Sequence, residues 1–190
     1  MDWIYEYLFP CLWLLYLVYW TAVSFKVKAT KRLESASSRI LRSVIFACAI
    51  LLLCDRELPI TVLYRQLFSA GPGPFFAGTA ITIAGLLFSV WARLFLGRNW
   101  SRSVTIKQDH ELITSGPYAL VRHPIYTGIL AGFLGTALAI AQVRGFLAFF
   151  LILIALSFKL RLEEQWMHSH FGKIYEDYAR GVPALLPRPF

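Results

Sequence analysis

The sequence predicts an all-α, polytopic membrane protein that folds as a single domain. Hydrophobic residues make up 57% of the 190 residues and charged residues only 16%, a smaller charged share than soluble domains carry. The apolar residues are concentrated in runs typical of transmembrane helices, and polar segments separate the runs. We expect five transmembrane helices, over residues 3–25, 43–54, 75–92, 124–142 and 145–158.

The N-terminal part, residues 1–92, contains the first three predicted spans. The first span carries no charge from Tyr7 onward, and the aromatic residues near its ends suit the membrane–water interfaces. The second span is short, and its helix could continue past residue 54 towards Tyr64. The sequence Gly71-Pro72-Gly73-Pro74 predicts a turn before the third span.

The C-terminal part, residues 93–190, contains the last two spans and most of the polar chain. Residues 93–121 form a long polar connection, in which an alternation over residues 103–106 is a weak strand signal. Residues 159–190 form a charged tail that starts helical and ends as proline-rich coil. Only two or three residues separate the last two spans, so we expect them to form an antiparallel hairpin.

The fourth span carries a stripe of small residues. Such spacing lets helix backbones approach closely in lipid. We expect this stripe to serve packing and to hold the start of the fourth span near the end of the fifth. Its members recur at every fourth position in two overlapping series: Gly128 and Gly132, then Ala131, Gly135 and Ala139.

The basic residues predict the orientation. Sixteen of the 19 lysines and arginines follow the first, third and fifth spans. Because cytoplasmic segments are enriched in lysine and arginine, we expect the N-terminus outside and the C-terminus in the cytoplasm. The same rule accounts for the formal net charge of +8, so we expect the lipid bilayer as a partner and no nucleic acid.

A motif at the start of the fourth span predicts an anion site. Pro124 suits the first position of a helix, and it biases His123 before it towards an extended conformation. A helix begins with free backbone N–H groups and a partial positive charge. Arg122 and His123 stand beside that end, so the motif has the features of an anion-binding helix N-terminus.

A second cluster follows the fifth span, in the sequence Lys159-Leu160-Arg161-Leu162-Glu163-Glu164. Lys159 and Glu163 are four residues apart and share a helix face, whereas Arg161 points elsewhere. Alone, the cluster is equally typical of a solvated interface. Beside the predicted anion site, a cation and a carboxylate that face one pocket could bind a zwitterion.

Aromatic residues continue this pattern in the tail. Phe171, Tyr175 and Tyr178 have the spacing of one face of an amphipathic helix. We expect that helix to pack on the bundle or the bilayer surface, with a contribution as a lid over the pocket.

The sequence argues against several other sites. The three cysteines are scattered in apolar runs, and no His-Glu-x-x-His or paired-cysteine motif is present, so we expect no metal. A glycine-rich dinucleotide fingerprint after a strand is also missing.

Several motifs occur together in a specific order, and this combination resembles the isoprenylcysteine carboxyl methyltransferase family. Related phospholipid and small-thiol methyltransferases of membranes share much of the pattern. The resemblance spans residues 99–187, and this chain is similar to the compact, prokaryotic form. The motifs are Gly116-Pro117-Tyr118, Arg122-His123-Pro124-x-Tyr126-x-Gly128, Glu163-Glu164, Phe171-Gly172, Tyr175, Tyr178 and Val182-Pro183.

The resemblance implies a membrane enzyme that uses S-adenosylmethionine. A family arginine falls on Lys159, a substitution that matters where a bidentate contact is needed, and Arg161 could take over its role. Arg122, Arg161 and Asn99 are the candidate catalytic residues, and either arginine could hold an acceptor carboxylate. The cofactor-binding candidates are His110, Glu111, Leu112, Ile113, Tyr118, His123, Pro124, Ile125, Tyr126, Lys159 and Glu163.

We therefore expect S-adenosylmethionine-dependent methyl transfer to a lipophilic acceptor, with a prenylcysteine-type carboxylate as the first candidate. A phospholipid amine or a small thiol stays open as the acceptor. Two further alternatives are an NADPH-dependent membrane reductase and a scaffold without enzymatic activity.

Overall fold

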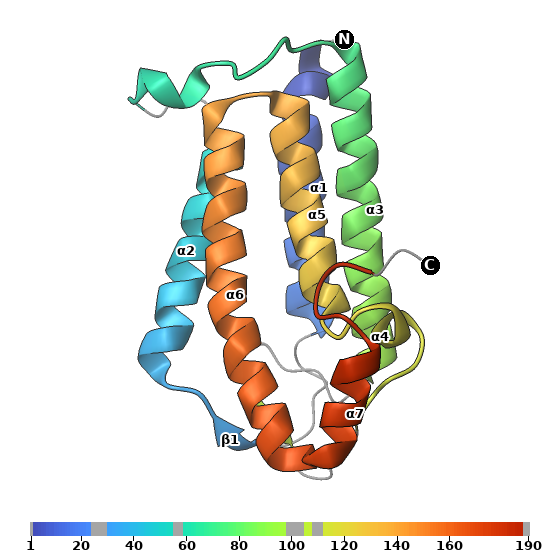
Figure 1. The fold of residues 1–190 in the computed structure, drawn as a ribbon. Helices are drawn as coiled ribbons and strands as arrows, with labels where there is room; N and C mark the ends of the chain where they lie inside the picture. The colour runs from blue at the N-terminus through green and yellow to red at the C-terminus, as the bar shows by residue number, and fades with distance from the viewer. Residues whose placement is uncertain (1, 24–29, 55–58, 98–104, 108–111, 188–190) are drawn as a thin grey trace.

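The computed structural model describes residues 2–23, 30–54, 59–97, 105–107 and 112–187 (Figure 1). The described residues form five long helices, two short ones, a 3-10 turn and two short strands. In chain order they are α1 (Asp2–Val23), β1 (Thr30–Leu33), α2 (Ala36–Cys54), η1 (Thr61–Tyr64), α3 (Pro72–Leu96), β2 (Thr105–Lys107), α4 (Pro117–Leu120), α5 (Pro124–Ile140), α6 (Val143–Phe171) and α7 (Lys173–Gly181).

Helices form at all five predicted apolar runs. In the described part of the chain, α1, α2, α3 and α6 are long and apolar enough to cross a membrane, and α5 is an apolar helix of 17 residues. The protein is therefore an all-helical, polytopic membrane protein with four long apolar helices. The crossing of the membrane by α5 and the orientation of the bundle stay predictions.

Three helices are longer than their predicted apolar runs, and one of them is α3, which covers Pro72–Leu96 rather than residues 75–92. The α2 helix begins at Ala36 rather than at residue 43, and the hydroxyl of Ser35 accepts a hydrogen bond from the backbone N–H of Ser38 at that end. The α6 helix runs without a break to Phe171, because residues 159–171 contain no proline or glycine. The predicted span ends at residue 158, and α6 continues past it, which confirms that the charged tail starts helical.

The all-α prediction misses one small sheet. Strands β1 and β2 pair antiparallel, with Thr30 opposite Lys107 and Leu33 opposite Thr105. The weak alternation over residues 103–106 overlaps β2, whereas the sequence of β1 was read only as a basic flank.

The stripe of small residues packs α5 against α3, and the expectation that it joins α5 to α6 was wrong. A Cβ atom added at Gly85 would lie 2.6 Å from the carbonyl oxygen of Gly128, and one added at Gly135 would lie 2.5 Å from that of Gly78. Close approach of two backbones needs small residues on both helices, and α3 supplies them. Figure 1 shows α3 and α5 side by side.

The hairpin of α5 and α6 brings distant segments to one end of the bundle. The two helices run in opposite directions, so the last turns of α6 lie near the start of α5 (Figure 1). Gly172 then adopts a φ of 53°, a conformation that favours glycine, and the chain turns into α7. As a result, α4, the start of α5, the end of α6 and α7 gather at the lower end in Figure 1.

Candidate functional site

Arg122, just before α5, forms hydrogen bonds to α6 and to α7 with the residue after it. Its Nε and Nη2 atoms donate to the two carboxylate oxygens of Glu164 on α6, at 3.0 and 2.9 Å. Its Nη1 atom donates to the carbonyl oxygens of Ala179 and Val182, at and just beyond the end of α7. Burial lowers the pKa of Arg122, but the hydrogen bonds to Glu164 outweigh it and raise that pKa. Arg122 therefore holds the start of α5 in place and is already occupied by the chain's own acceptors.

His123 lies between two carboxylates of α6. Its Nε2 atom is 2.7 Å from an oxygen of Glu164, and its Nδ1 atom is 3.5 Å from an oxygen of Glu163. Burial lowers the pKa of His123, but the hydrogen bonds to the two glutamates outweigh it, so the pKa is raised and the imidazolium is favoured. At the predicted anion site, Arg122 and His123 therefore contact the chain's own glutamates, and the binding of an external anion there stays a prediction.

Lys159 and Glu163 form the second half of the cluster, as their spacing predicts. Lys159 Nζ is 3.9 Å from Glu163 Oε1, and the phenol of Tyr126 donates to the same oxygen at 2.6 Å. Lys159 also lies over the ring of Tyr126, 5.1 Å from its centroid. Arg161, two residues further along α6, is exposed, because two residues turn a helix by more than half a circle. The structure does not bring Arg161 to this cluster.

Two tyrosines of α7, in the C-terminal tail, close the site. Tyr175 donates its phenol proton to Glu164 at 2.7 Å, and Tyr178 donates to the carbonyl oxygen of Tyr118 at 2.6 Å. Burial raises the pKa of Tyr175, and burial raises the pKa of Tyr178 to about 12, so both phenols are donors at neutral pH. The predicted stripe is divided, since Phe171 ends α6 and only the two tyrosines belong to α7.

The chain after α7 runs along the start of α5. The backbone N–H groups of Arg122 and His123 donate to the carbonyl oxygens of Pro183 and Ala184, at 2.8 and 3.0 Å. The hydroxyl of Thr127 donates to the next carbonyl oxygen, that of Leu185. The first two contacts satisfy backbone donors just before α5 begins, and all three join the segment after α7 to the Arg122-His123-Pro124 motif.

A cavity of about 820 Å³ begins at this cluster and extends between the helices. Its volume lies in the range of small-molecule sites. One end is polar, and side chains of α1, α2, α5 and α6 make the remainder apolar. The polar end includes Arg42, Tyr118, His123, Tyr126, Lys159, Glu163 and Tyr178, and the apolar part includes Leu17, Trp20, Phe46, Ile50, Ile129, Ile152 and Leu156.

Most of the residues proposed from the sequence line this cavity. Asn99, His110 and Glu111 lie outside the described residues, and Arg161 is exposed on α6. Among the described residues, no group of three or more histidine, cysteine, aspartate or glutamate side chains has the arrangement of a metal site. The predicted residues that line the cavity are Leu112, Ile113, Tyr118, Arg122, His123, Pro124, Ile125, Tyr126, Lys159 and Glu163.

Sequence reasoning missed three residues of the site. It named Glu164 as part of a motif and as a possible proton acceptor for an amine or thiol substrate, but not as the residue that accepts hydrogen bonds from Arg122 and Tyr175 and contacts His123. It read Arg39 and Arg42 as basic flanks of the second span, although both line the cavity. Their spacing of three residues, which puts them on one helix face ahead of an apolar run, was the available signal.

The comparisons with known proteins agree with this geometry. Residues 74–174 match the phospholipid methyltransferase family. A probable protein-S-isoprenylcysteine O-methyltransferase of Oryza sativa subsp. indica is 33% identical over 115 residues, which cover 59% of this chain and 60% of the relative. Methanethiol S-methyltransferase 2 of Bradyrhizobium diazoefficiens is 42% identical over 78 residues, which cover 38% of this chain and 27% of that protein.

A solved structure has the same fold. The eukaryotic intramembrane Ras methyltransferase ICMT (isoprenylcysteine carboxyl methyltransferase) superposes with a TM-score of 0.53 at 25% sequence identity, over 79% of this chain and 50% of the other. The chain thus spans about 60% of the rice relative and half of the solved structure. The family match covers more than half of the chain, from α3 through the end of α6. This chain belongs to the phospholipid methyltransferase family of membrane proteins.

Proposed function

We propose that the protein is an S-adenosylmethionine-dependent methyltransferase that acts on a lipophilic acceptor inside the membrane. One observation carries this proposal: a cavity in which a partly buried Lys159–Glu163 pair meets apolar walls from four helices. The family match and the methyltransferase names of the relatives support it. Those relatives differ in their named acceptors, so the acceptor must be argued from this chain.

The residues at the polar end fit S-adenosylmethionine. The cofactor carries a carboxylate and an ammonium group, and Lys159 and Glu163 offer the opposite charges 3.9 Å apart. Tyr118 and the apolar Leu112 and Ile113 line the same cavity and suit an adenine ring. Because Arg161 is exposed, we assign the role of the family arginine to Lys159. When bound, S-adenosylmethionine supplies a methyl group that its sulfonium has already activated.

The surrounding residues hold this site rigid. Tyr126 and His123 fix the carboxylate of Glu163, and the Arg122–Glu164 pair fixes His123 in turn. Methyl transfer from an activated donor requires alignment of the reacting atoms and exclusion of water rather than a strong acid or base. The residues of this chain therefore contribute by orienting the cofactor, and α7 covers the polar end of the cavity.

The state of His123 favours a carboxylate acceptor. A carboxylate is ionised at neutral pH and needs no base, whereas an amine or a thiol must lose a proton. Both ring nitrogens of His123 already lie against glutamates, at 3.5 and 2.7 Å, so neither nitrogen is free to accept a proton from an amine or a thiol. Among the open acceptors, a lipophilic carboxylate of the prenylcysteine type therefore fits best.

We also propose the membrane placement predicted from the sequence. All five long helices would cross the bilayer, with the N-terminus outside and the polar end of the cavity at the cytoplasmic face. The 190 residues would then act as one methyltransferase domain, in which residues 93–190 supply most of the cofactor-binding residues. A lipophilic acceptor would reach the cavity from the bilayer.

Calorimetric titration of the purified protein with S-adenosylhomocysteine tests the proposal. We expect binding that Glu163→Gln weakens about tenfold, because the variant removes a buried charge that contacts the ligand. Glu176→Gln, on the exposed face of α7, is the matched control and should bind like the parent. Absence of binding to the parent, or tighter binding of NADPH, would overturn the proposal.

Transfer of a radiolabelled methyl group should then be compared among a farnesylcysteine analogue, a phospholipid amine and a small thiol. Labelling of the farnesylcysteine carboxylate above the other two would support the acceptor assignment. Labelling of the thiol or the amine alone would replace it.

A further inference from the structure

The α2 helix contributes two arginines to the wall of the cavity. Arg39 and Arg42 both line it, and they are three residues apart, so they occupy neighbouring positions on one face of α2. The matched family segment begins at residue 74, so both arginines lie outside it. They are therefore features of this chain that the family match does not explain.

Arg42 lies near the proposed cofactor pair. It forms an ion pair with Glu34, whose side chain is 1% exposed. It also lines the same cavity as Lys159 and Tyr126. The positive face of α2 therefore reaches the polar end of the cavity, where methyl transfer is proposed to occur.

Arg39 differs from the other cations in the cavity wall. Arg42, Arg122 and Lys159 each have a glutamate within ion-pair distance. Within the described chain, by contrast, no carboxylate or hydrogen-bond acceptor contacts the guanidinium of Arg39, and its Nε atom is buried. A buried donor without an acceptor costs free energy, and a bound anion would remove that cost.

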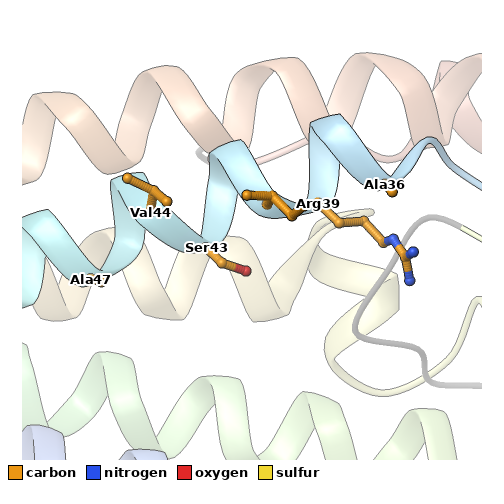
Figure 2. A pocket seen from close by; sticks show the side chains of 6 residues that line it. Ala36, Arg39, Ser43, Val44 and Ala47 are labelled. Carbon is orange, nitrogen blue, oxygen red and sulfur yellow. The ribbon is translucent and has the colours of Figure 1, made fainter.

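The surroundings of Arg39 suit a molecule with an apolar chain. Arg39, Ser43 and Ala47 line both the cavity and a shallow groove on the surface of α2. Figure 2 shows Arg39 and Ser43 on the same side of α2. The guanidinium of Arg39 points away from Ser43, towards the start of the helix at Ala36. A ligand whose charged group contacts Arg39 would therefore have its apolar chain beside small and apolar side chains.

We propose that Arg39, with Arg42 beside it, binds the anionic group of the methyl acceptor and selects for lipophilic acceptors that carry a negative charge at or next to the methylated atom. This inference rests on the proposed methyl transfer. In the carboxylate case, the methyl–sulfur bond breaks, a methyl–oxygen bond forms, and no proton is transferred. The products are a neutral ester and S-adenosylhomocysteine, so methylation removes the charge that Arg39 binds and favours release of the ester.

Binding of defined amphiphiles in detergent tests this role without the cofactor. The probes are N-acetyl-S-farnesylcysteine, its neutral methyl ester, and farnesyl phosphate. We expect the parent to bind the acid at least tenfold more tightly than the ester, and Arg39→Gln to remove most of that difference while binding the ester unchanged. Arg39→Lys should keep part of the difference, because it retains the charge but not the planar fork.

The controls separate this inference from the proposed function. Arg180→Gln, an exposed arginine on α7 with a side chain 71% exposed, should leave all three affinities unchanged. S-adenosylhomocysteine should bind Arg39→Gln as it binds the parent, whereas failure of the parent to bind it would overturn the proposed function instead. If Arg39→Gln lowers the affinity for the acid alone, Arg39 forms a carboxylate site. If it lowers the affinity for farnesyl phosphate as well, Arg39 forms a general anion site that includes phospholipids.

Two results would overturn the inference. One is equal affinity of the parent for the acid and the ester. The other is a variant Arg39→Gln that lowers the affinity for both probes by the same factor, as expected if Arg39 only anchors α2 at the membrane interface.

Discussion

The two sides of α5 differ in how closely they pack against their neighbours. On one side, glycines of α3 and α5 bring the two backbones so close that an added Cβ at Gly135 would lie 2.5 Å from a carbonyl oxygen. On the other side, α5 faces a cavity of about 820 Å³, across which α2 presents Arg39 and Arg42. The first side fixes the position of the Arg122-His123-Pro124 motif, and the second side leaves space for ligands. A methyltransferase needs both, because a rigid cofactor site must meet an acceptor site that can be entered and left.

The polar side chains on α2 and around the start of α5 differ in whether they have partners within the chain. Around the start of α5, four side chains contact glutamates of α6: Arg122, His123, Tyr126 and, from α7, Tyr175. On α2, Arg39 has no such partner among the described residues. Networks that are fully satisfied add rigidity, whereas a donor without an acceptor marks a surface that gains from a ligand.

Replacement of Glu164 should have the largest effect on the rigid side. Glu164→Gln removes the charge that Arg122 and His123 both contact, and it leaves two buried cationic groups without their main partner. Loss of one member of a buried ion pair costs about 3 kcal/mol of the free energy of unfolding. Thermal unfolding in detergent measures it, with Glu176→Gln as the exposed control. If both variants unfolded at the same temperature, the network would not hold the site.

Substitution in the glycine contact should have a somewhat smaller effect. Gly135→Ala adds one carbon atom between the backbones of α3 and α5, where overpacking costs about 1–3 kcal/mol. Gly73→Ala, at a position with no atom within 4 Å of the added carbon, should leave the unfolding temperature unchanged or raise it slightly. Equal unfolding temperatures for the two variants would show that the helices can separate without cost.

A change of pH should have the smallest effect on the unfolding temperature. The pKa of His123 is raised above its ordinary value of about 6.5. The stability contributed by its contacts with Glu163 and Glu164 is therefore complete below about pH 6.5 and is lost as the pH rises through the raised pKa of His123 in the folded protein. The unfolding temperature of the parent should fall as the pH rises through this pKa, and His123→Gln should reduce the fall. A parent whose unfolding temperature rises with pH in this window would contradict the assignment.

The sequence predicted the local features of this comparison but not the facing partners. Hydropathy located all five apolar runs, and helix periodicity paired Lys159 with Glu163 and turned Arg161 away from them. The small-residue spacing correctly indicated a close contact of α5, but Gly78 and Gly85 on α3 decided which helix makes it. Pairing of two helices depends on both surfaces, and each was visible only as a pattern along its own segment.

The same limit applies to the site. The motif at the start of α5 predicted an anion site, yet only the fold shows that Glu163 and Glu164 lie against His123. Arg39 and Arg42 have the sequence context of an ordinary cytoplasmic flank. Their place in the cavity wall follows from the packing of α2 beside α6, which hydropathy does not encode.

A structure of the protein with bound S-adenosylhomocysteine tests the central claim most directly. The account predicts that the amino-acid part of the ligand contacts Lys159 and Glu163, that its adenine lies against Tyr118, and that its sulfur faces the apolar part of the cavity. A ligand bound at another place, with the Lys159–Glu163 pair still intact, would contradict the account.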